Sequence, residues 1–415
     1  MNSQTLSNDI STIPLIINEN VDKNISKKTI INKQSLISGF RKNLAVLSFR
    51  ITIIGIAIKS YNNPWNWIYV PLTLIKLRRK NLGQHYLKKL AYVDNRYYWG
   101  LYTPGWNGIS FKKFIAAEMN HVVPVKQKVN RFINAYVAIT KKCSLQCEHC
   151  YEWENLNKKE TLSPTQLKNI VAKIQEKGVS QIHFSGGEPL LKVDLLIDIL
   201  NSAKKETDFW VLTSGFKLTF DNAKKLKMAG LNGVMISLDH FNAEKHNQFR
   251  GFKDAYLWVE NGVKNAIDNQ LVVALSLCTT KDFTTFDNLI TYANLAKKLG
   301  VSFIQILEPK AVGHYSGKDV SLSSDQINLL ENFYLEMNYN PKYKDYPLIS
   351  YHGYYQRQQG CYAAGNRSLY IDTDGDINPC PFCQSKTGNV LDADFDKSIL
   401  KLQNLGCHQF NSNRN

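Results

Sequence analysis

The sequence predicts an α/β protein whose main domain is a partial (β/α)6 barrel resembling a TIM barrel. Between residues 131 and 310, short apolar segments alternate with longer amphipathic ones. The expected strands are Ala135–Thr140, Gln181–Phe184, Phe209–Thr213, Val234–Leu238, Val272–Leu277 and Phe303–Leu307. Strands that alternate with helices form a parallel sheet, and six units are too few to close an eight-stranded barrel. We therefore expect an open barrel with its site at the C-terminal ends of the strands.

Helix signals separate these strands. Ser163 and Gln166 form a capping box, and Pro164 between them suits the first helical position. One apolar face then follows at helical spacing, on Leu167, Ile170, Val171 and Ile174. Gly178 is the expected end of this helix, and Phe286–Leu299 is a second clear helix.

The positive charge of the chain is concentrated in its N-terminal third. Residues 1–140 carry 20 Lys and Arg against 5 Asp and Glu, whereas residues 141–415 carry 31 against 30. Such an asymmetry bears on binding partners rather than on the fold. No RNA-binding motif accompanies it, so we do not assign a nucleic-acid partner.

We expect residues 1–36 to be a mobile tail and residues 37–130 to be a basic, helical region. Leu44–Ile58 is apolar but interrupted by Arg50, and it is shorter than the roughly 20 apolar residues of a transmembrane helix. Aromatic and then basic residues follow it, at Trp65, Trp67, Tyr69, Lys76, Arg78, Arg79 and Lys80. This order fits either a helix on an anionic membrane surface or a helical domain packed on the core with a solvated basic face.

Three cysteines follow the first expected strand directly. Cys143, Cys147 and Cys150 have the spacing C-x3-C-x2-C on one loop. Thiolates are the usual ligands of iron–sulfur clusters, and three of them would leave one iron of a 4Fe–4S cluster open. The alternative is a structural zinc site with His149 or a remote residue as the fourth ligand.

A glycine-rich turn follows the second strand. Gly186 and Gly187 would let a ligand approach the backbone closely, and Glu188 would offer its carboxylate to a cationic group. A lone Gly-Gly-Glu-Pro segment is an ordinary turn. Because this segment lies one βα unit after the three-cysteine loop, it is a much more specific sign of a ligand site.

With these two motifs, residues 134–310 resemble the radical S-adenosylmethionine (SAM) superfamily. The resemblance implies that the three cysteines bind a 4Fe–4S cluster, that SAM chelates its open iron, and that Gly186, Gly187 and Glu188 receive the SAM amino group. It also implies reductive cleavage of SAM to a 5′-deoxyadenosyl radical, with an electron from a donor such as a flavodoxin or ferredoxin.

Further segments match the family less closely. Thr213-Ser214-Gly215 stands where the family often has Thr-Asn-Gly, and Ser237-Leu238-Asp239 is similar to its ISLD segment. Arg250 matches an arginine that pairs with the SAM carboxylate. By this resemblance Ser214, Ser237, Asp239 and Arg250 are SAM contacts. The alternative roles are a strand-end residue for Ser237, a helix cap for Asp239 and a surface cation for Arg250.

A helical connector over residues 311–345 leads to a cysteine-bearing module at 346–415. Its Asp-Thr-Asp-Gly-Asp run has glycine at loop position four rather than six, which favours a β-hairpin turn over a calcium loop. The spacing of Cys361, Gly375 and Cys380 resembles the SPASM and twitch extensions of radical SAM enzymes. That resemblance implies one auxiliary iron–sulfur cluster on Cys361, Cys380, Cys383 and Cys407, with zinc as the alternative metal. Cys278 we interpret as a packed thiol.

By the same resemblance we expect a peptide or protein substrate, since Cys147–Tyr151 has the Cys-x-His-Cys-Tyr form common among peptide-modifying members. The alternatives are a small-molecule or lipid radical dehydrogenase and a non-catalytic zinc-bound scaffold. The first residues lack a secretory signal pattern, so we expect a cytoplasmic enzyme, with peripheral contact to an anionic membrane if the N-terminal region binds one.

Overall fold

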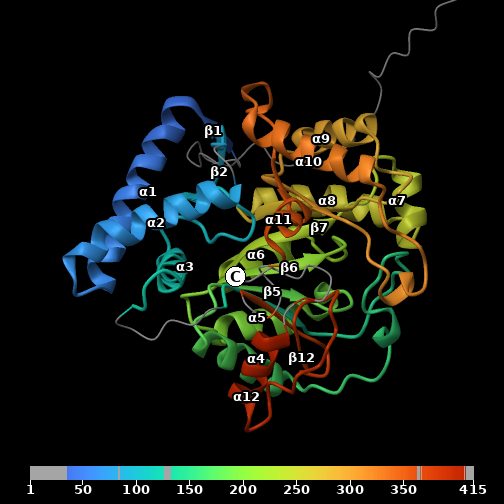
Figure 1. The fold of residues 1–415 in the computed structure, drawn as a ribbon. Helices are drawn as coiled ribbons and strands as arrows, with labels where there is room; N and C mark the ends of the chain where they lie inside the picture. Colours follow the sequence, from blue (N-terminus) through green and yellow to red (C-terminus); the bar gives the residue numbers. More distant parts are fainter. Residues whose placement is uncertain are drawn as a thin grey trace, which may run out of the picture. The chain divides into compact units, whose positions relative to one another are not determined.

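The central sheet is built from short apolar strands that alternate with helices, as the sequence pattern requires. The computed structural model describes residues 35–82, 85–125, 132–361, 365, 367–405 and 407 (Figure 1). The six core strands are β4 (Asn134–Ala138), β5 (Gln181–Ser185), β6 (Asp208–Thr213), β7 (Leu231–Ser237), β8 (Val272–Cys278) and β9 (Phe303–Leu307). They pair in parallel in chain order, so the predicted partial barrel is confirmed.

The sheet is wider than predicted. β10 (Leu348–Tyr351) pairs in parallel with β9, and β11 (Ser368–Ile371) pairs in parallel with β4. β12 (Ile377–Asn378) then pairs antiparallel with β11, so β10 and β12 are the edges of this open sheet. The added strands are short and pair with partners distant in sequence, so local periodicity carries little signal for them.

Helices accompany the sheet, and most of them pack on its outer face. They are α4 (Pro164–Glu176), α5 (Val193–Ser202), α6 (Phe220–Ala229), α7 (Ala243–Arg250), α8 (Ala255–Asp268), α9 (Phe286–Leu299), α10 (Ser324–Tyr339), α11 (His352–Gln359) and α12 (Phe395–Leu405). The capping box of Ser163 and Gln166 is present at α4, and Gly178 follows that helix at φ 75°. α9 has the predicted bounds.

The strands alternate in side-chain direction, and this places the site. Val211 and Ile236 point outward into the main core beneath the helices, whereas Trp210 and Met235 point into the barrel. Gly233 makes room for the Trp210 ring, which a Cβ at that position would strike. The interior is apolar at Trp210 and Met235, and the buried polar side chain of His183, which pairs with Trp210 across β5 and β6, lies next to them.

The N-terminal region is mixed rather than only helical. It contains β1 (Ser35–Ser38), α1 (Gly39–Ser60), α2 (Pro64–Leu82), β2 (Lys89–Val93), β3 (Arg96–Tyr98) and α3 (Ile109–Asn120). β1, β2 and β3 form a separate antiparallel sheet, so the expected tail over 1–36 ends in a strand; residues 1–34 lie outside the described part of the chain. Residues 126–130 of the predicted region also lie outside it.

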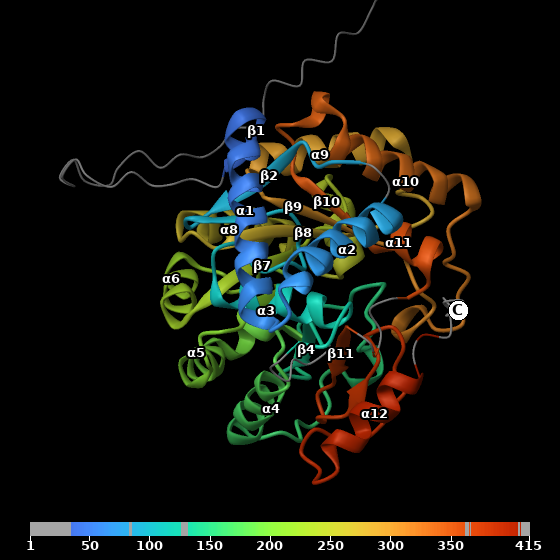
Figure 2. The same cartoon turned by 60° about the vertical axis from the view of Figure 1, so that its left-hand side comes forward.

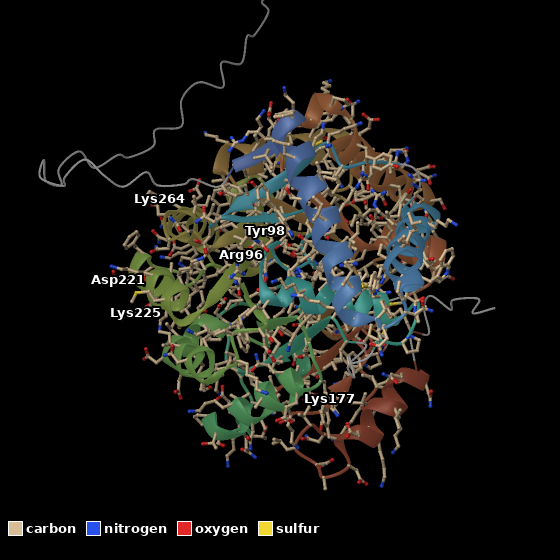
Figure 3. The ribbon with its side chains drawn as sticks, turned by 90° about the vertical axis from the view of Figure 1, so that its left-hand side faces the viewer. Arg96, Tyr98, Lys177, Asp221, Lys225 and Lys264 are labelled. Atoms are coloured by element: carbon tan, nitrogen blue, oxygen red, sulfur yellow. The ribbon has the colours of Figure 1, made fainter. Side chains whose placement is uncertain are left out.

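A buried carboxylate connects this region to the barrel. Ala91 and Tyr98 of the β2–β3 hairpin lie in one buried cluster with Trp210 of β6 (Figure 3 labels Tyr98 and Arg96). Asp208, the first residue of β6, accepts hydrogen bonds from the Ser110 hydroxyl at 2.7 Å and the Gly105 amide at 3.2 Å, and its Oδ1 lies 3.3 Å from the Arg96 guanidinium. These contacts close the N-terminal end of the barrel.

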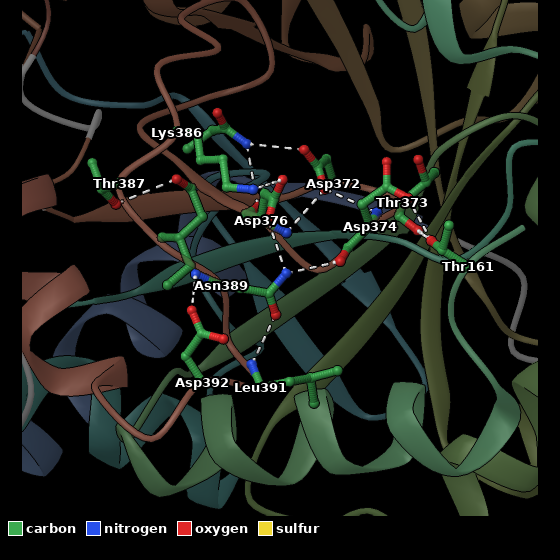
Figure 4. Close-up of polar contacts among 12 residues, drawn as sticks. Thr161, Asp372, Thr373, Asp374, Asp376, Lys386, Thr387, Asn389, Leu391 and Asp392 are labelled. Atoms are coloured by element: carbon green, nitrogen blue, oxygen red, sulfur yellow. Dashed lines mark hydrogen bonds and ion pairs between the residues drawn. The ribbon is translucent and has the colours of Figure 1, made fainter.

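The C-terminal hairpin turns at Gly375 as predicted, with φ 83°. The Asp372 carboxylate accepts from the backbone amides of Asp374 and Asp376, both at 2.9 Å (Figure 4). Asp374 also forms an ion pair with buried Lys141 at 2.6 Å, two residues before the first cysteine of the trio. The hairpin therefore supports the three-cysteine loop.

Asp208→Ala should destabilise the protein by about 3 kcal/mol, because it leaves Arg96, Ser110 and the Gly105 amide without their buried partner. The matched control is Lys264→Ala (Figure 3), which removes an exposed i,i+4 ion pair with Asp268 and should cost less than about 0.5 kcal/mol. Urea unfolding of both variants measures the difference. Equal losses would contradict an anchoring role for Asp208.

Lys89→Met should flatten the pH dependence of stability above neutrality. Burial, with a smaller effect of Lys297, lowers the pKa of Lys89 to about 7, against an opposing effect of Asp345. Between about pH 7 and the unfolded-state pKa near 10.5, the unfolded chain binds a proton that the folded chain lacks, so this residue makes stability rise with pH. Over this window the free energy of unfolding should rise with pH more steeply in the wild type than in the variant. The difference between the two slopes should reach about 1 kcal/mol per pH unit. Parallel curves from urea titrations at about pH 7, 8 and 9 would refute this.

Candidate active site around the three-cysteine loop

One large cavity joins the two groups of cysteines that the sequence singles out. It has a volume of about 1740 Å³ and lies against the C-terminal ends of the core strands. Its lining includes Cys143, Cys147, Cys150, Cys361, Cys380, Cys383 and Cys407. All eight cysteines of the chain lie in the described part, and none forms a disulfide. The tertiary structure thus brings both predicted ligand sets to a single space.

Backbone contacts hold the three-cysteine loop in place. The Cys143 amide donates to the Asn157 side chain at 3.1 Å, and the Asn157 amide group donates back to the Cys143 carbonyl at 3.0 Å. The Cys150 carbonyl accepts from the His314 amide at 2.9 Å. Because backbone groups are used in this way, the thiols are left to bind a ligand. Asn157 and His314 carry no motif, so sequence reasoning did not find them.

Gly313 makes the contact with Cys150 possible. Its φ is 56°, and a Cβ there would overlap the Cys150 carbonyl and the Tyr151 backbone. His314, the next residue, stacks on Trp153 with ring centroids 3.8 Å apart and has its Nδ1 2.9 Å from the Cys147 carbonyl. The loop after β9 therefore clamps the cysteine loop from the far side of the barrel.

Gly186 and Gly187 pack closely on the three-cysteine loop, and their predicted contact with a ligand stays a prediction. A Cβ on Gly186 would strike the Thr140 carbonyl, and one on Gly187 would strike that of Lys142. The Gly187 amide donates to Thr140 O at 2.7 Å, and the Glu188 amide donates to Lys142 O at 2.8 Å. The glycines thus let the turn pack on the cysteine loop. Both also line the cavity, where a ligand can reach them.

Glu188 lines the cavity and is held there by hydrogen bonds from the protein; its contact with a cationic group of a ligand stays a prediction. Its buried carboxylate accepts from the Leu190 amide, the Thr213 hydroxyl at 2.7 Å, and both the amide and the hydroxyl of Ser214 at 2.8 and 2.6 Å. Burial raises the pKa of Glu188 and these hydrogen bonds oppose the rise, Ser214 most strongly. Glu188 therefore connects the turns after β5 and β6 and orients Ser214 at the cavity wall.

Asp239 and Arg250 form a buried ion pair beside the cysteines. Arg250 Nη2 lies 2.5 Å from Asp239 Oδ2, and its Nη1 lies 3.4 Å from the Cys147 sulfur. Burial alone would raise the pKa of Asp239, but the charge of Arg250, helped by His149, holds it below its usual value. Arg250 lines the cavity and Asp239 supports it from behind; both were predicted as ligand contacts. Ser237 also lines the cavity.

The geometry gives no support to a zinc site. Among the described residues, no group of three or more His, Cys, Asp or Glu side chains converges as the ligands of one metal ion. His149, the proposed fourth ligand, has its Nε2 4.0 Å from Asp239. In a 4Fe–4S cluster each thiolate binds a different iron, so its ligands need not converge on one point. The three thiols on one wall of the cavity fit that cluster.

The second set of cysteines lines the same cavity, and Phe382 between Cys380 and Cys383 contacts the ring of Tyr151 beside Cys150. Cys380 and Cys383 pair through their backbones, and the sulfurs of Cys383 and Cys407 are 3.9 Å apart. Cys361 accepts a 3.6 Å contact from Gln356 Nε2 of α11. Cys278 is buried at the end of β8 and is absent from the lining, as predicted for a packed thiol.

Aromatic and polar side chains form the floor of the cavity, and motif searches did not find them. Tyr136 and His183 stack at 5.1 Å, and Tyr102 from the N-terminal region contacts both rings. Tyr102 also contacts His352 of α11 and accepts from Gln305 Nε2 at 2.5 Å. Burial lowers the pKa of His183 to about 3 and that of His352 to about 4, so both are neutral. Strand alternation alone could have placed Tyr136 and His183 inside.

Comparison with known proteins identifies a family for the core. The family model described as the Radical SAM superfamily matches residues 137–291. The probable GTP 3′,8-cyclase of Methanocaldococcus jannaschii is 40% identical over 152 residues, covering 35% of this chain and 50% of that protein. The GTP 3′,8-cyclase of Campylobacter jejuni (strain RM1221) is 32% identical over 198 residues, covering 46% of this chain and 60% of that protein. The match thus spans little more than half the length of these curated relatives.

Solved structures share the fold at low sequence identity. Streptococcus suis SuiB bound to the precursor peptide SuiA has a TM-score of 0.52 and 15% identity, covering 71% of this chain and 68% of that one. Native anSMEcpe with bound AdoMet and Cp18Cys peptide has a TM-score of 0.52 and 17% identity, covering 67% of this chain and 82% of that one. At such low sequence identities the similarity shows the fold alone.

Gly313→Ala should prevent stable metal loading, since the new Cβ would displace the Cys150 backbone. Iron and sulfide per chain, measured after anaerobic reconstitution, should fall by at least half. Gly317→Ala is the matched control: its φ is also positive, at 75°, but nothing lies within 4 Å of the added Cβ, so the backbone strain is shared and the clash is not. Equal iron content in the two variants would contradict the clamping role of Gly313.

Proposed function

Since this chain belongs to the radical SAM superfamily, we propose that it cleaves S-adenosylmethionine at a 4Fe–4S cluster held by Cys143, Cys147 and Cys150. The observation that carries the proposal is the presence of these three thiols on one wall of a cavity that Gly186, Gly187, Ser214, Ser237 and Arg250 also line. When bound, the reduced cluster and S-adenosylmethionine supply a 5′-deoxyadenosyl radical that takes a hydrogen atom from a substrate C–H bond.

The residues of the chain position the reactants. Ser214, held by Glu188, presents its hydroxyl at the cavity wall, and Arg250, held by Asp239, presents positive charge next to Cys147. Arg250 would favour the thiolate form of Cys147 and the negative charge of a bound cluster. The closed floor at Tyr102 and His183 keeps water from the N-terminal end of the barrel.

Lys42, Arg50, Arg78 and Arg79 line the end of the cavity beside α1 and α2, whereas the other Lys and Arg residues of the lining face carboxylates. Around those paired cations the charges favour a substrate without a phosphate chain, in contrast to the GTP named for the sequence relatives. A triphosphate needs several cations that are not neutralised by the protein. Here Arg250 pairs with Asp239, Lys310 lies 3.9 Å from Glu308, and Arg367 pairs with Glu118. Arg357, at the same rim, pairs with Glu308 and Glu331.

The size of the cavity favours a large or extended substrate. Its volume of about 1740 Å³ would hold S-adenosylmethionine and the clusters as well as the substrate, and its lining extends from the cysteines to Ile54 and Ile68 of α1 and α2. We therefore infer that a peptide or protein segment is the substrate, which the apolar and aromatic walls would accept. The solved structures of similar fold include proteins bound to peptides, which agrees with this inference.

The second set of thiols supports an auxiliary cluster. Cys361, Cys380, Cys383 and Cys407 line the same cavity as the first three, with Cys383 and Cys407 3.9 Å apart. A cluster at this place would face the substrate and could bind it or accept its electron. A one-electron donor of the flavodoxin or ferredoxin type would reduce the first cluster.

Full-length protein reconstituted anaerobically should contain about eight iron atoms per chain on the two-cluster proposal. With dithionite and S-adenosylmethionine it should release 5′-deoxyadenosine. Serine replacement of Cys143, Cys147 and Cys150 together should abolish that product and lower the iron content to about four. The same change at Cys380 and Cys383 should lower iron similarly while cleavage persists. Cys278→Ala is the matched control and should keep both iron and product.

Two results would overturn parts of this proposal separately. Full iron content in the triple variant would remove the cluster assignment. Conversion of GTP to a cyclised product, followed by mass spectrometry, would replace the peptide substrate while leaving S-adenosylmethionine cleavage in place. On the peptide proposal, GTP stays intact, and a peptide encoded beside this gene shows a change in mass.

A further inference from the structure

The exposed faces of α1 and α2 are strongly apolar. α1 packs one side, including Phe49, Ile53 and Ile56, against α2 and α3. Its opposite side exposes six large apolar side chains at spacings of three and four residues, Phe40, Leu44, Leu47, Ile51, Ile54 and Ile58. α2 adds Trp65, Ile68, Tyr69, Leu72 and Ile75. We call these two sets of residues the outer face. Monomeric proteins rarely expose apolar patches of this extent without a partner.

Basic side chains border the outer face, and acidic ones are missing. Residues 35–93 contain ten Lys and Arg and no Asp or Glu. At about 100° per residue, Arg41 and Lys59 lie on one side of the α1 stripe and Arg50 on the other, and all three are exposed. Lys76 and Arg79 are exposed on α2. A second copy of this chain would bring like charges together, so an anionic partner fits better.

We propose that the outer face of α1 and α2 docks on the surface of an anionic lipid bilayer. An apolar stripe bordered by cations, with Trp65 and Tyr69 beside it, is the pattern of a helix that lies in the headgroup region. The proposal is peripheral rather than transmembrane because the inner side of α1 packs on α2 and α3. By length and composition alone α1, at 22 residues, could cross a membrane, which corrects our expectation that it is too short.

The cavity reaches this surface. Ile54, Ile58, Ile68 and Leu72 are both exposed on the outer face and part of the cavity lining (Figure 2 shows α1 and α2 beside the sheet). A substrate held at the bilayer would therefore meet the opening of the cavity. That consequence rests on the proposed function, whereas the docking itself does not.

The test uses the reconstituted full-length protein and vesicles of phosphatidylcholine with or without about 30% phosphatidylglycerol. The protein should float with the anionic vesicles, and at least tenfold less with neutral ones or at high salt. Leu47→Glu/Ile51→Glu, at two outer-face positions outside the cavity lining, should reduce flotation at least tenfold. Met228→Glu/Leu400→Glu is the matched control, since those side chains are exposed apolar residues elsewhere, and it should float like the wild type.

The remaining outcomes each decide the proposal. No flotation of the wild type, or equal flotation of both double variants, overturns it. A wild-type dimer that Leu47→Glu/Ile51→Glu converts to a monomer in sedimentation overturns it in favour of a second copy. Retention in cell membranes after alkaline carbonate extraction overturns the peripheral mode. Because 5′-deoxyadenosine release is measured in parallel and should be kept by both variants, failure of docking is distinguishable from failure of the proposed function.

Discussion

The site depends on the backbone contact between residues 140–142 and residues 186–188. Here the parallel pairing of β4 and β5 continues beyond the strand ends, with the Gly187 and Glu188 amides donating to Thr140 and Lys142. A side chain at either glycine would separate the two segments. Because the contact exists, the cysteine loop leaves the sheet in a defined direction, and the Glu188 carboxylate can reach Ser214.

The three-cysteine loop is then fixed by groups from distant parts of the chain. Asn157 binds the loop at Cys143, Gly313 and His314 bind it at Cys150, and Lys141 pairs with Asp374 of the C-terminal hairpin. The contact with Asp374 also gives the buried Lys141 ammonium group a partner. The thiols are therefore positioned by the surrounding structure rather than by their own short segment, as a preorganised site requires.

The N-terminal region closes the barrel and offers a separate surface. Its β2–β3 hairpin fills the end of the barrel that the six core strands leave open, and Gly105 of this region donates to Asp208 of β6. Its helices α1 and α2 bury one side on each other and on α3 and expose the other. Since α1 is apolar on both its packed and its exposed side, its sequence periodicity could not separate the two. One side of α1 packs on α2 and α3, and contact with a membrane stays a proposal for its other side.

Local sequence determined the six core strands, the α4 capping box, the α9 bounds, the hairpin turn at Gly375 and the two groups of cysteines. These depend on periodicity, on turn chemistry and on the ligand preference of sulfur, which act over a few residues. Tertiary structure alone decided the pairing of β10 and β11 with the core, the Glu188–Ser214 and Asp239–Arg250 contacts, and the meeting of Tyr102, His183 and His352. Those contacts join residues far apart in the chain, and they form because buried polar groups and inward-facing side chains must find partners in the packed barrel.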